Sequence, residues 1–138
     1  MPLLSQYEHR TWPAQDGALK GSQDIAQTQD GALWIGTRSG LLRFDGARFV
    51  PHNQFGDVSI AQWNIRFVRA TRDGSLWLGA EGRLGRVKNG QLRQYAVAGE
   101  IPALREGPDG VIWFTRTTVL GSQKAPLCSV SNEVLRCV

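Results

Sequence analysis

Short apolar runs separated by Asp-Gly or Asn-Gly pairs recur along most of the chain. In the stretch DGALWIGTRSGLLRFDGARF, residues 30–49, the pairs Asp30-Gly31 and Asp45-Gly46 bound two such runs. An Asp-Gly pair between apolar runs favours a tight hairpin of type I′, which needs positive φ at both central residues. No window has a sustained apolar period of 3.6 residues, so helices are not expected. The pattern predicts an all-β fold built from short antiparallel strands.

One motif, Asp-Gly-x-Leu/Ile-Trp, occurs three times and defines a repeat. Its tryptophans, Trp34, Trp77 and Trp113, are 43 and 36 residues apart. Periods of this length are typical of β-propeller blades, which have four short strands each. We expect these tryptophans to fill the space between stacked sheets, and Gly36 and Gly79 to permit close backbone approach. The structural repeat therefore consists of Asp30, Gly31, Trp34, Gly36, Asp73, Gly74, Trp77, Gly79, Asp109, Gly110 and Trp113.

The three units predict three four-stranded antiparallel blades within residues 1–138. Blade 1 is expected at residues 23–53, blade 2 at 62–97 and blade 3 at 102–138. In blade 2, Asn89-Gly90 is expected to form a type I′ turn into the outer strand. Since a closed ring needs at least about four blades, the chain is predicted to be a partial, open propeller.

Unit one resembles the two-component regulator propeller repeat. The resemblance lies in D-G-x-L-W-I-G-T-x-x-G-L-x-R-F-D-G-x-x-F at residues 30–49, and GPDGVIWFT at residues 107–115 also resembles blades of the streptogramin-lyase type. The resemblance implies the N-terminal part of a periplasmic sensor propeller. It implies a membrane receptor of the histidine kinase, hybrid two-component or diguanylate cyclase type, with its effector domain outside this chain. A cytoplasmic location stays open.

The net charge of +4 changes this picture little. Most cations are arginines that stand singly at alternating positions, as expected for the solvated faces of half-buried strands. No basic run accompanies them, so no nucleic-acid partner is expected. The longest aliphatic or aromatic run is residues 111–114, far below the length that spans a bilayer, so this segment is not expected to contact a membrane.

Trp63 stands in the connection before blade 2 and has no equivalent in the other units. Such connections share one rim of a propeller with the loops between second and third strands. Trp63 is a candidate stacking face, with hydrogen bonds from Gln62 and Asn64, for an oligosaccharide or another small ligand. The favoured alternative is a partly buried loop aromatic. Charged residues in or near the second-to-third-strand loops complete the candidate ligand-binding set: Arg38, Glu81, Arg83 and Arg116.

No catalytic constellation is evident. The two histidines, His9 and His52, fall on the lead-in strand and on the outer strand of blade 1, away from the expected rim. There is no Ser/His/Asp set, P-loop, paired-carboxylate motif or H-E-x-x-H. We therefore expect a non-catalytic sensor without a metal or cofactor. A protein-interaction platform without a small ligand is the alternative function, and a lyase-like propeller enzyme is the third.

The two cysteines fall on the last predicted hairpin. If Asn132-Glu133 is its two-residue turn, Cys128 lies opposite Cys137 in a non-hydrogen-bonded pair, with Cα atoms about 4.5 Å apart. This separation is near the short end of the disulfide range. A bridge in an oxidising compartment and two packed thiols in a cytosolic chain are both open.

An open stack of three blades predicts association. It exposes an apolar blade face at each end and an unpaired strand edge. Residues 6–12, QYEHRTW, read as a lead-in outer strand that has no blade of its own. Two alternatives follow: further propeller blades complete the ring, or the chain self-associates, with two copies giving six blades.

Overall fold

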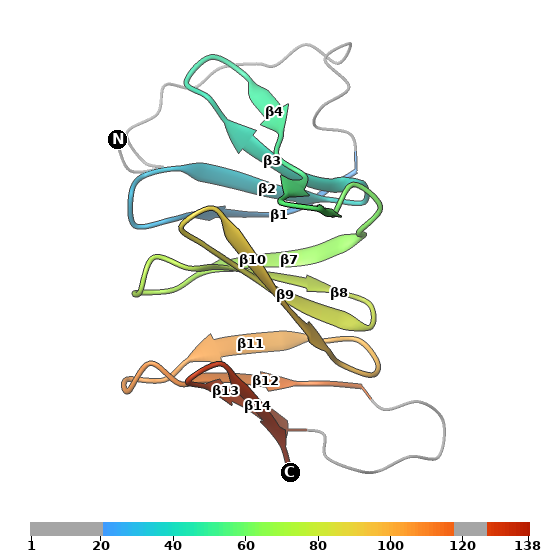
Figure 1. The fold of residues 1–138 in the computed structure, drawn as a ribbon, viewed down its shortest axis with the longest axis vertical. Helices are drawn as coiled ribbons and strands as arrows, with labels where there is room; N and C mark the ends of the chain where they lie inside the picture. The colour runs from blue at the N-terminus through green and yellow to red at the C-terminus, as the bar shows by residue number, and fades with distance from the viewer. Residues whose placement is uncertain (1–20, 118–126) are drawn as a thin grey trace.

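The computed structural model describes residues 21–117 and 127–138, and every regular element in this part of the chain is a β-strand. Three four-stranded antiparallel sheets are stacked as blades 1, 2 and 3 from top to bottom in Figure 1. The predicted all-β blade architecture is confirmed. The expected lead-in strand at residues 6–12, and with it His9, lies outside the described residues.

The strands of each blade follow one another in chain order. Blade 1 consists of β1 (Ser22–Gln27), β2 (Leu33–Thr37), β3 (Gly40–Phe44) and β4 (Phe49–Pro51). The connection to blade 2 contains a small hairpin made of β5 (Gln54–Phe55) and β6 (Val58–Ser59). Blade 2 consists of β7 (Ile65–Ala70), β8 (Leu76–Ala80), β9 (Arg83–Lys88) and β10 (Gln91–Ala96). Blade 3 consists of β11 (Ala103–Glu106), β12 (Ile112–Thr115), β13 (Leu127–Ser131) and β14 (Val134–Cys137).

The turn between the first two strands of each blade is not the predicted type I′ turn. In blade 1, Gly31 has a positive φ of 90° but Asp30 does not. The backbone N–H of Gly31 bonds to the carbonyl of Thr28, and that of Thr28 to the carbonyl of Ala32. These bonds define a three-residue loop with glycine in the left-handed position. The Asp30 carboxylate favours this loop because it accepts the N–H of Ala32 at 3.0 Å.

The turns into the outer strands of blades 1 and 2 are of two types. Asn89 and Gly90 have φ values of 53° and 74°, so the predicted type I′ turn is confirmed there. Asp45-Gly46 was predicted to do the same, and this is wrong, because only Gly46 has a positive φ. The backbone N–H of Asp45 bonds to the carbonyl of Arg48 at 2.9 Å, and the Asp45 carboxylate accepts the N–H of Arg48 at 2.8 Å, so Gly46 and Ala47 form the turn instead.

Two apolar cores hold the stack together. The core between blades 1 and 2 contains Trp34 and Leu41 from blade 1 and Leu78 from blade 2. The core between blades 2 and 3 contains Trp77 from blade 2 and Phe114 from blade 3. Each of these tryptophans therefore lies on the face that packs against the following blade.

The glycines of the second strands lie where neighbouring side chains leave no room. A Cβ at Gly36 would lie 2.6 Å from Cγ2 of Ile65, and a Cβ at Gly79 would overlap the ring of Phe67. Neither glycine has a positive φ, so glycine is required here for space. The close approach expected from the sequence is present at both positions.

A threonine fastens each of the first two motif tryptophans. The Thr28 hydroxyl accepts the Nε1–H of Trp34 at 3.0 Å and donates to Asp30 at 2.7 Å. Blade 2 repeats the arrangement, with Thr71 accepting from Trp77 at 3.3 Å. In both blades an arginine of the third strand also lies over the indole, 5.4 and 5.7 Å from its centroid.

Blade 3 lacks both of these partners. Gly107 stands at the threonine position, and Ser129 lies opposite Trp113 where the other blades have arginine. Trp113 is 43% exposed, whereas Trp34 and Trp77 are 8% and 3% exposed. The prediction that all three tryptophans pack between sheets is therefore wrong for Trp113, because no described sheet follows blade 3.

Restoring the missing threonine should stabilise blade 3. The backbone at Gly107 makes the same turn as that at Thr28, and a Cβ there would lie 3.5 Å from Nε1 of Trp113 and 2.9 Å from Oδ1 of Asp109. A small shift of that carboxylate admits the side chain. Gly107→Thr is expected to raise the free energy of unfolding by about 1 kcal/mol through the new hydrogen bonds. Urea denaturation measures this, with Gly107→Val as the isosteric control without a hydroxyl. Equal gains in both variants would contradict the proposed role of the hydroxyl.

Candidate functional site

A pocket of about 330 Å³ lies at the rim of the propeller that carries the second-to-third-strand loops, and it is called the rim pocket below. It lies between the connection that precedes β7 and the turn between β8 and β9. Five of the seven predicted ligand-binding residues line it, so the structure brings together residues from two separate loops. Its lining consists of Ser59, Gln62, Trp63, Asn64, Ala80, Glu81 and Arg83.

Arg38 and Arg116, the two other candidates, do not line the rim pocket. Arg38 lies in the loop between β2 and β3, where its backbone N–H bonds to the carbonyl of Gly21 at 3.1 Å. Arg116 directly follows β12 and is half-buried. Both sit in the predicted type of loop, but on other blades, so their part in ligand binding stays a prediction.

Trp63 is part of the core, and the predicted stacking face is wrong. Only 5% of the residue is exposed, because the folded connection buries it together with Phe55 and Ile60. The Arg83 guanidinium lies over the ring at 5.0 Å from its centroid, and a Cβ at Gly85 would be 3.0 Å from a ring carbon. No face of the indole is free to receive a sugar ring.

Hydrogen-bonding and charged groups remain as the binding chemistry of the rim pocket. The side-chain oxygen of Asn64, Oδ1, accepts a hydrogen bond from the side-chain amide of Gln23 at 2.5 Å, and this bond orients the Asn64 side chain. Within residues 21–117 and 127–138, neither Glu81 nor Arg83 forms an ion pair. The pocket therefore offers a carboxylate, a guanidinium and amides to a small polar ligand.

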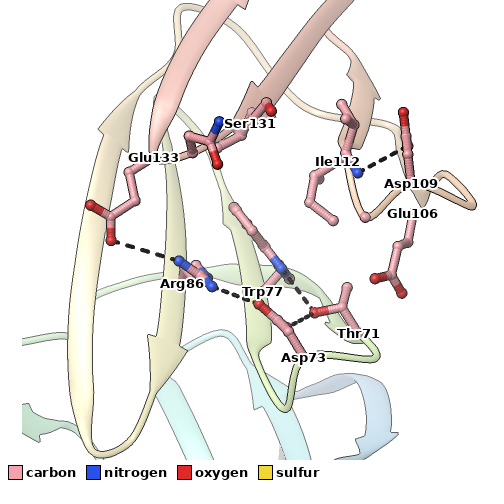
Figure 2. A pocket seen from close by; sticks show the side chains of 13 residues that line it. Thr71, Asp73, Trp77, Arg86, Glu106, Asp109, Ile112, Ser131 and Glu133 are labelled. Atoms are coloured by element: carbon pink, nitrogen blue, oxygen red, sulfur yellow. Dashed lines mark hydrogen bonds and ion pairs between the residues drawn. The ribbon is translucent and has the colours of Figure 1, made fainter.

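A second pocket, of about 550 Å³, lies at the opposite rim, between the turns of blades 2 and 3. Figure 2 shows its ion-pair chain, in which Arg86 contacts Asp73 at 2.6 Å and Glu133 at 3.9 Å. Trp77 forms one wall and donates to Thr71. The sequence analysis missed this group. The signal for it was the arginine that stands nine residues after each of the first two motif tryptophans.

The charges of this second pocket join the blades. Burial by itself would raise the pKa of Asp73, but hydrogen bonds from Thr71, Ser75 and Arg86 together hold it well below its usual range. The carboxylate is therefore ionised at neutral pH and occupied by protein donors. Across the blade boundary, Glu133 of blade 3 also pairs with Arg93 of blade 2 at 3.5 Å. We interpret these ion pairs as structural contacts between blades 2 and 3.

His52 is half-buried and packs against core aromatics. Its ring lies 5.1 Å from that of Trp34 and 5.4 Å from that of Phe55 between ring centroids. Burial, and next the positive charge of Arg43, lower the pKa of His52, so the ring is mainly neutral at pH 7. It does not line the rim pocket. In the described part of the chain, no three His, Cys, Asp or Glu side chains are grouped to hold a metal ion, and no helix could cross a membrane.

No protein-family model matches the chain, and no curated protein matches it in sequence. Solved structures do match. The extracellular domain of BT4673 from B. thetaiotaomicron, described as a one component system, has a TM-score of 0.63 and 20% identity over 83% of this chain and 16% of that chain. The extracellular domain of the hybrid two component system BT3049 from the same organism has a TM-score of 0.61 and 15% identity, over 80% of this chain and 17% of that chain.

Virginiamycin B lyase from Staphylococcus aureus also matches, with a TM-score of 0.59 and 18% identity over 84% of this chain and 40% of the lyase chain. This chain thus spans less than half the length of each of these proteins. At such identities the likeness shows the fold. It confirms the propeller architecture, and both kinds of propeller that the repeats resemble are represented among the matches.

Proposed function

We propose that this chain is a ligand-recognition part of a β-propeller sensor in a bacterial membrane receptor and does not itself catalyse a reaction. The rim pocket carries the proposal, because four polar side chains from two loops converge there: Gln62, Asn64, Glu81 and Arg83. The likeness to extracellular domains of one-component and two-component system proteins supports it. A periplasmic location, and a receptor of the histidine kinase, hybrid or diguanylate cyclase type, belong to the same proposal.

The ligand class follows from the groups that are free to bind. Because Trp63 is buried, recognition rests on hydrogen bonds and charge rather than on stacking. Arg83 is held over the Trp63 ring, so less of its side-chain freedom is lost on binding. The site suits a small polar molecule, such as an oligosaccharide with hydroxyl or carboxylate groups. The Arg83 guanidinium can bind a carboxylate by two parallel hydrogen bonds.

A thermal-shift screen with neutral and acidic oligosaccharides and amino acids tests this proposal. A compound that stabilises the wild-type protein should lose at least about tenfold in affinity in the Glu81→Gln/Arg83→Gln variant, equivalent to about 1.4 kcal/mol. Arg48→Gln, on an exposed turn at the opposite end of blade 1, is the matched control and should bind normally. Unchanged binding in the double variant would refute the rim pocket as the site.

A protein-interaction platform is the second candidate function. An exposed apolar blade face is its expected signature, and blade 3 presents one through Trp113, Leu127 and Val134. A lyase is the third candidate, because one matched structure is a lyase. However, His52 does not line the rim pocket, and His9 lies outside the described residues. We therefore place the enzyme last.

A further inference from the structure

The outward face of blade 3 is an apolar surface with positive charges beside it. Strand pairing and alternation put Trp113, Leu127 and Val134 on the side that points away from blade 2, at the bottom of Figure 1. Their exposed fractions are 43%, 40% and 49%. Arg105 lies opposite Trp113 on β11, and Arg136 lies on β14 in the same row. These five residues are called the open face below.

The same chain shows what covers a face of this kind. On blade 2 the corresponding tryptophan, Trp77, is only 3% exposed, because blade 3 packs over it. The covering surface is made of aliphatic and aromatic side chains from three strands: Leu104, Ile112, Phe114 and Val130. A sheet with such a face is the shape that fits the open face.

The positive charge of Arg136 further specifies the sheet that would cover the open face. Arg136 stands in blade 3 where Arg93 stands in blade 2, since each belongs to the row of its blade's motif tryptophan. Arg93 pairs at 3.5 Å with Glu133, which lies in the outermost turn of the following blade. A sheet that covers the open face in the same way would place its own outermost turn beside Arg136. A carboxylate in that turn would complete the contact.

We propose that the open face docks a fourth blade of stated chemistry: an antiparallel sheet with an apolar face for Trp113 and a carboxylate in its outermost turn for Arg136. This inference is independent of the proposed ligand. A second copy fits less well. Two open faces would bring Arg105 and Arg136 against their own kind, with no acidic residue among the five to balance them.

The test supplies the fourth blade from the chain's own sequence. Residues 96–138 are repeated after Val138, with the copy of Trp113 changed to Phe so that the original Trp113 reports on the open face. Acrylamide quenching is compared with the parent chain, and a Trp113→Phe chain isolates the signal. We expect quenching of Trp113 to fall about fivefold, the ratio of its 43% exposure to the 8% of Trp34. The melting temperature should also rise.

The charge contact has its own controls. Changing the copy of Glu133 to Arg should make Trp113 partly accessible to acrylamide again at low salt. Adding Arg136→Glu to that chain should again protect Trp113 from quenching. Three results would overturn the proposal: unchanged quenching of Trp113, an extended chain that melts no higher than the parent, or no effect of either charge change. A parent chain that doubles its mass at micromolar concentration and buries Trp113 would also overturn it, since a second copy would then be the occupant.

Discussion

Replacing Trp77 with alanine should lower the free energy of unfolding by about 3–5 kcal/mol, the usual cost of removing a buried aromatic side chain. The ring is 3% exposed and stacks on Tyr95 at 6.1 Å between centroids. Its removal also leaves the Thr71 hydroxyl without its indole donor. Trp63→Ala should cost a similar amount, because Trp63 is 5% exposed within the core between blades 1 and 2.

Trp113→Ala is the matched control, since Trp113 occupies the same repeat position as Trp77. It is 43% exposed, so its replacement should cost about 1 kcal/mol or less. Urea denaturation of the three variants, read by circular dichroism to avoid the lost fluorescence, gives the comparison. A small effect at Trp63 would restore the sequence-based interpretation of this residue as a loop aromatic at the rim. A large effect at Trp113 would mean that the open face is covered in solution.

The blade architecture could be predicted because it rests on local signals. Turn-forming pairs, apolar runs and a recurring Asp-Gly-x-Leu/Ile-Trp motif all lie within short windows of sequence. The register of the last hairpin also followed from its turn, and the observed pairing of Ser131 with Val134 confirms it. The turn types were less predictable. Asp30 and Asp45 bond their own backbone neighbours, and this local chemistry won over the positive φ that a type I′ turn requires.

The candidate site was predictable only in its location. The loops that carry Gln62 and Glu81 do meet, because propeller topology brings those loops to one end. The burial of Trp63 depends on Phe55 and Ile60, which a small hairpin folds beneath it, and no pattern in the sequence announces that packing. The exposure of Trp113 likewise depends on which sheet follows, so the same motif residue has two different environments.

Loss of the bond between Cys128 and Cys137 is the second change that should lower the stability of the fold by a large amount. The structure joins these residues in a disulfide across the last hairpin, with Cα atoms 4.0 Å apart. Cys128 is 1% exposed and belongs to the core between blades 2 and 3. Loss of the cross-link should lower the free energy of unfolding by about 2–3 kcal/mol, the value that loop-closure entropy gives for so short a loop.

The measurement is urea denaturation of the unreduced and the reduced protein, with the Cys128→Ala/Cys137→Ala variant as the control that a reductant should not affect. Because the hairpin carries Glu133, reduction should also loosen the inter-blade pair of Glu133 with Arg93. Since cytosolic thiols are kept reduced, the bond forms only where the compartment is oxidising, which agrees with the proposed periplasmic location. A thiol titration decides the premise: two free thiols in the folded, air-oxidised protein would contradict both the bond and the predicted loss of stability.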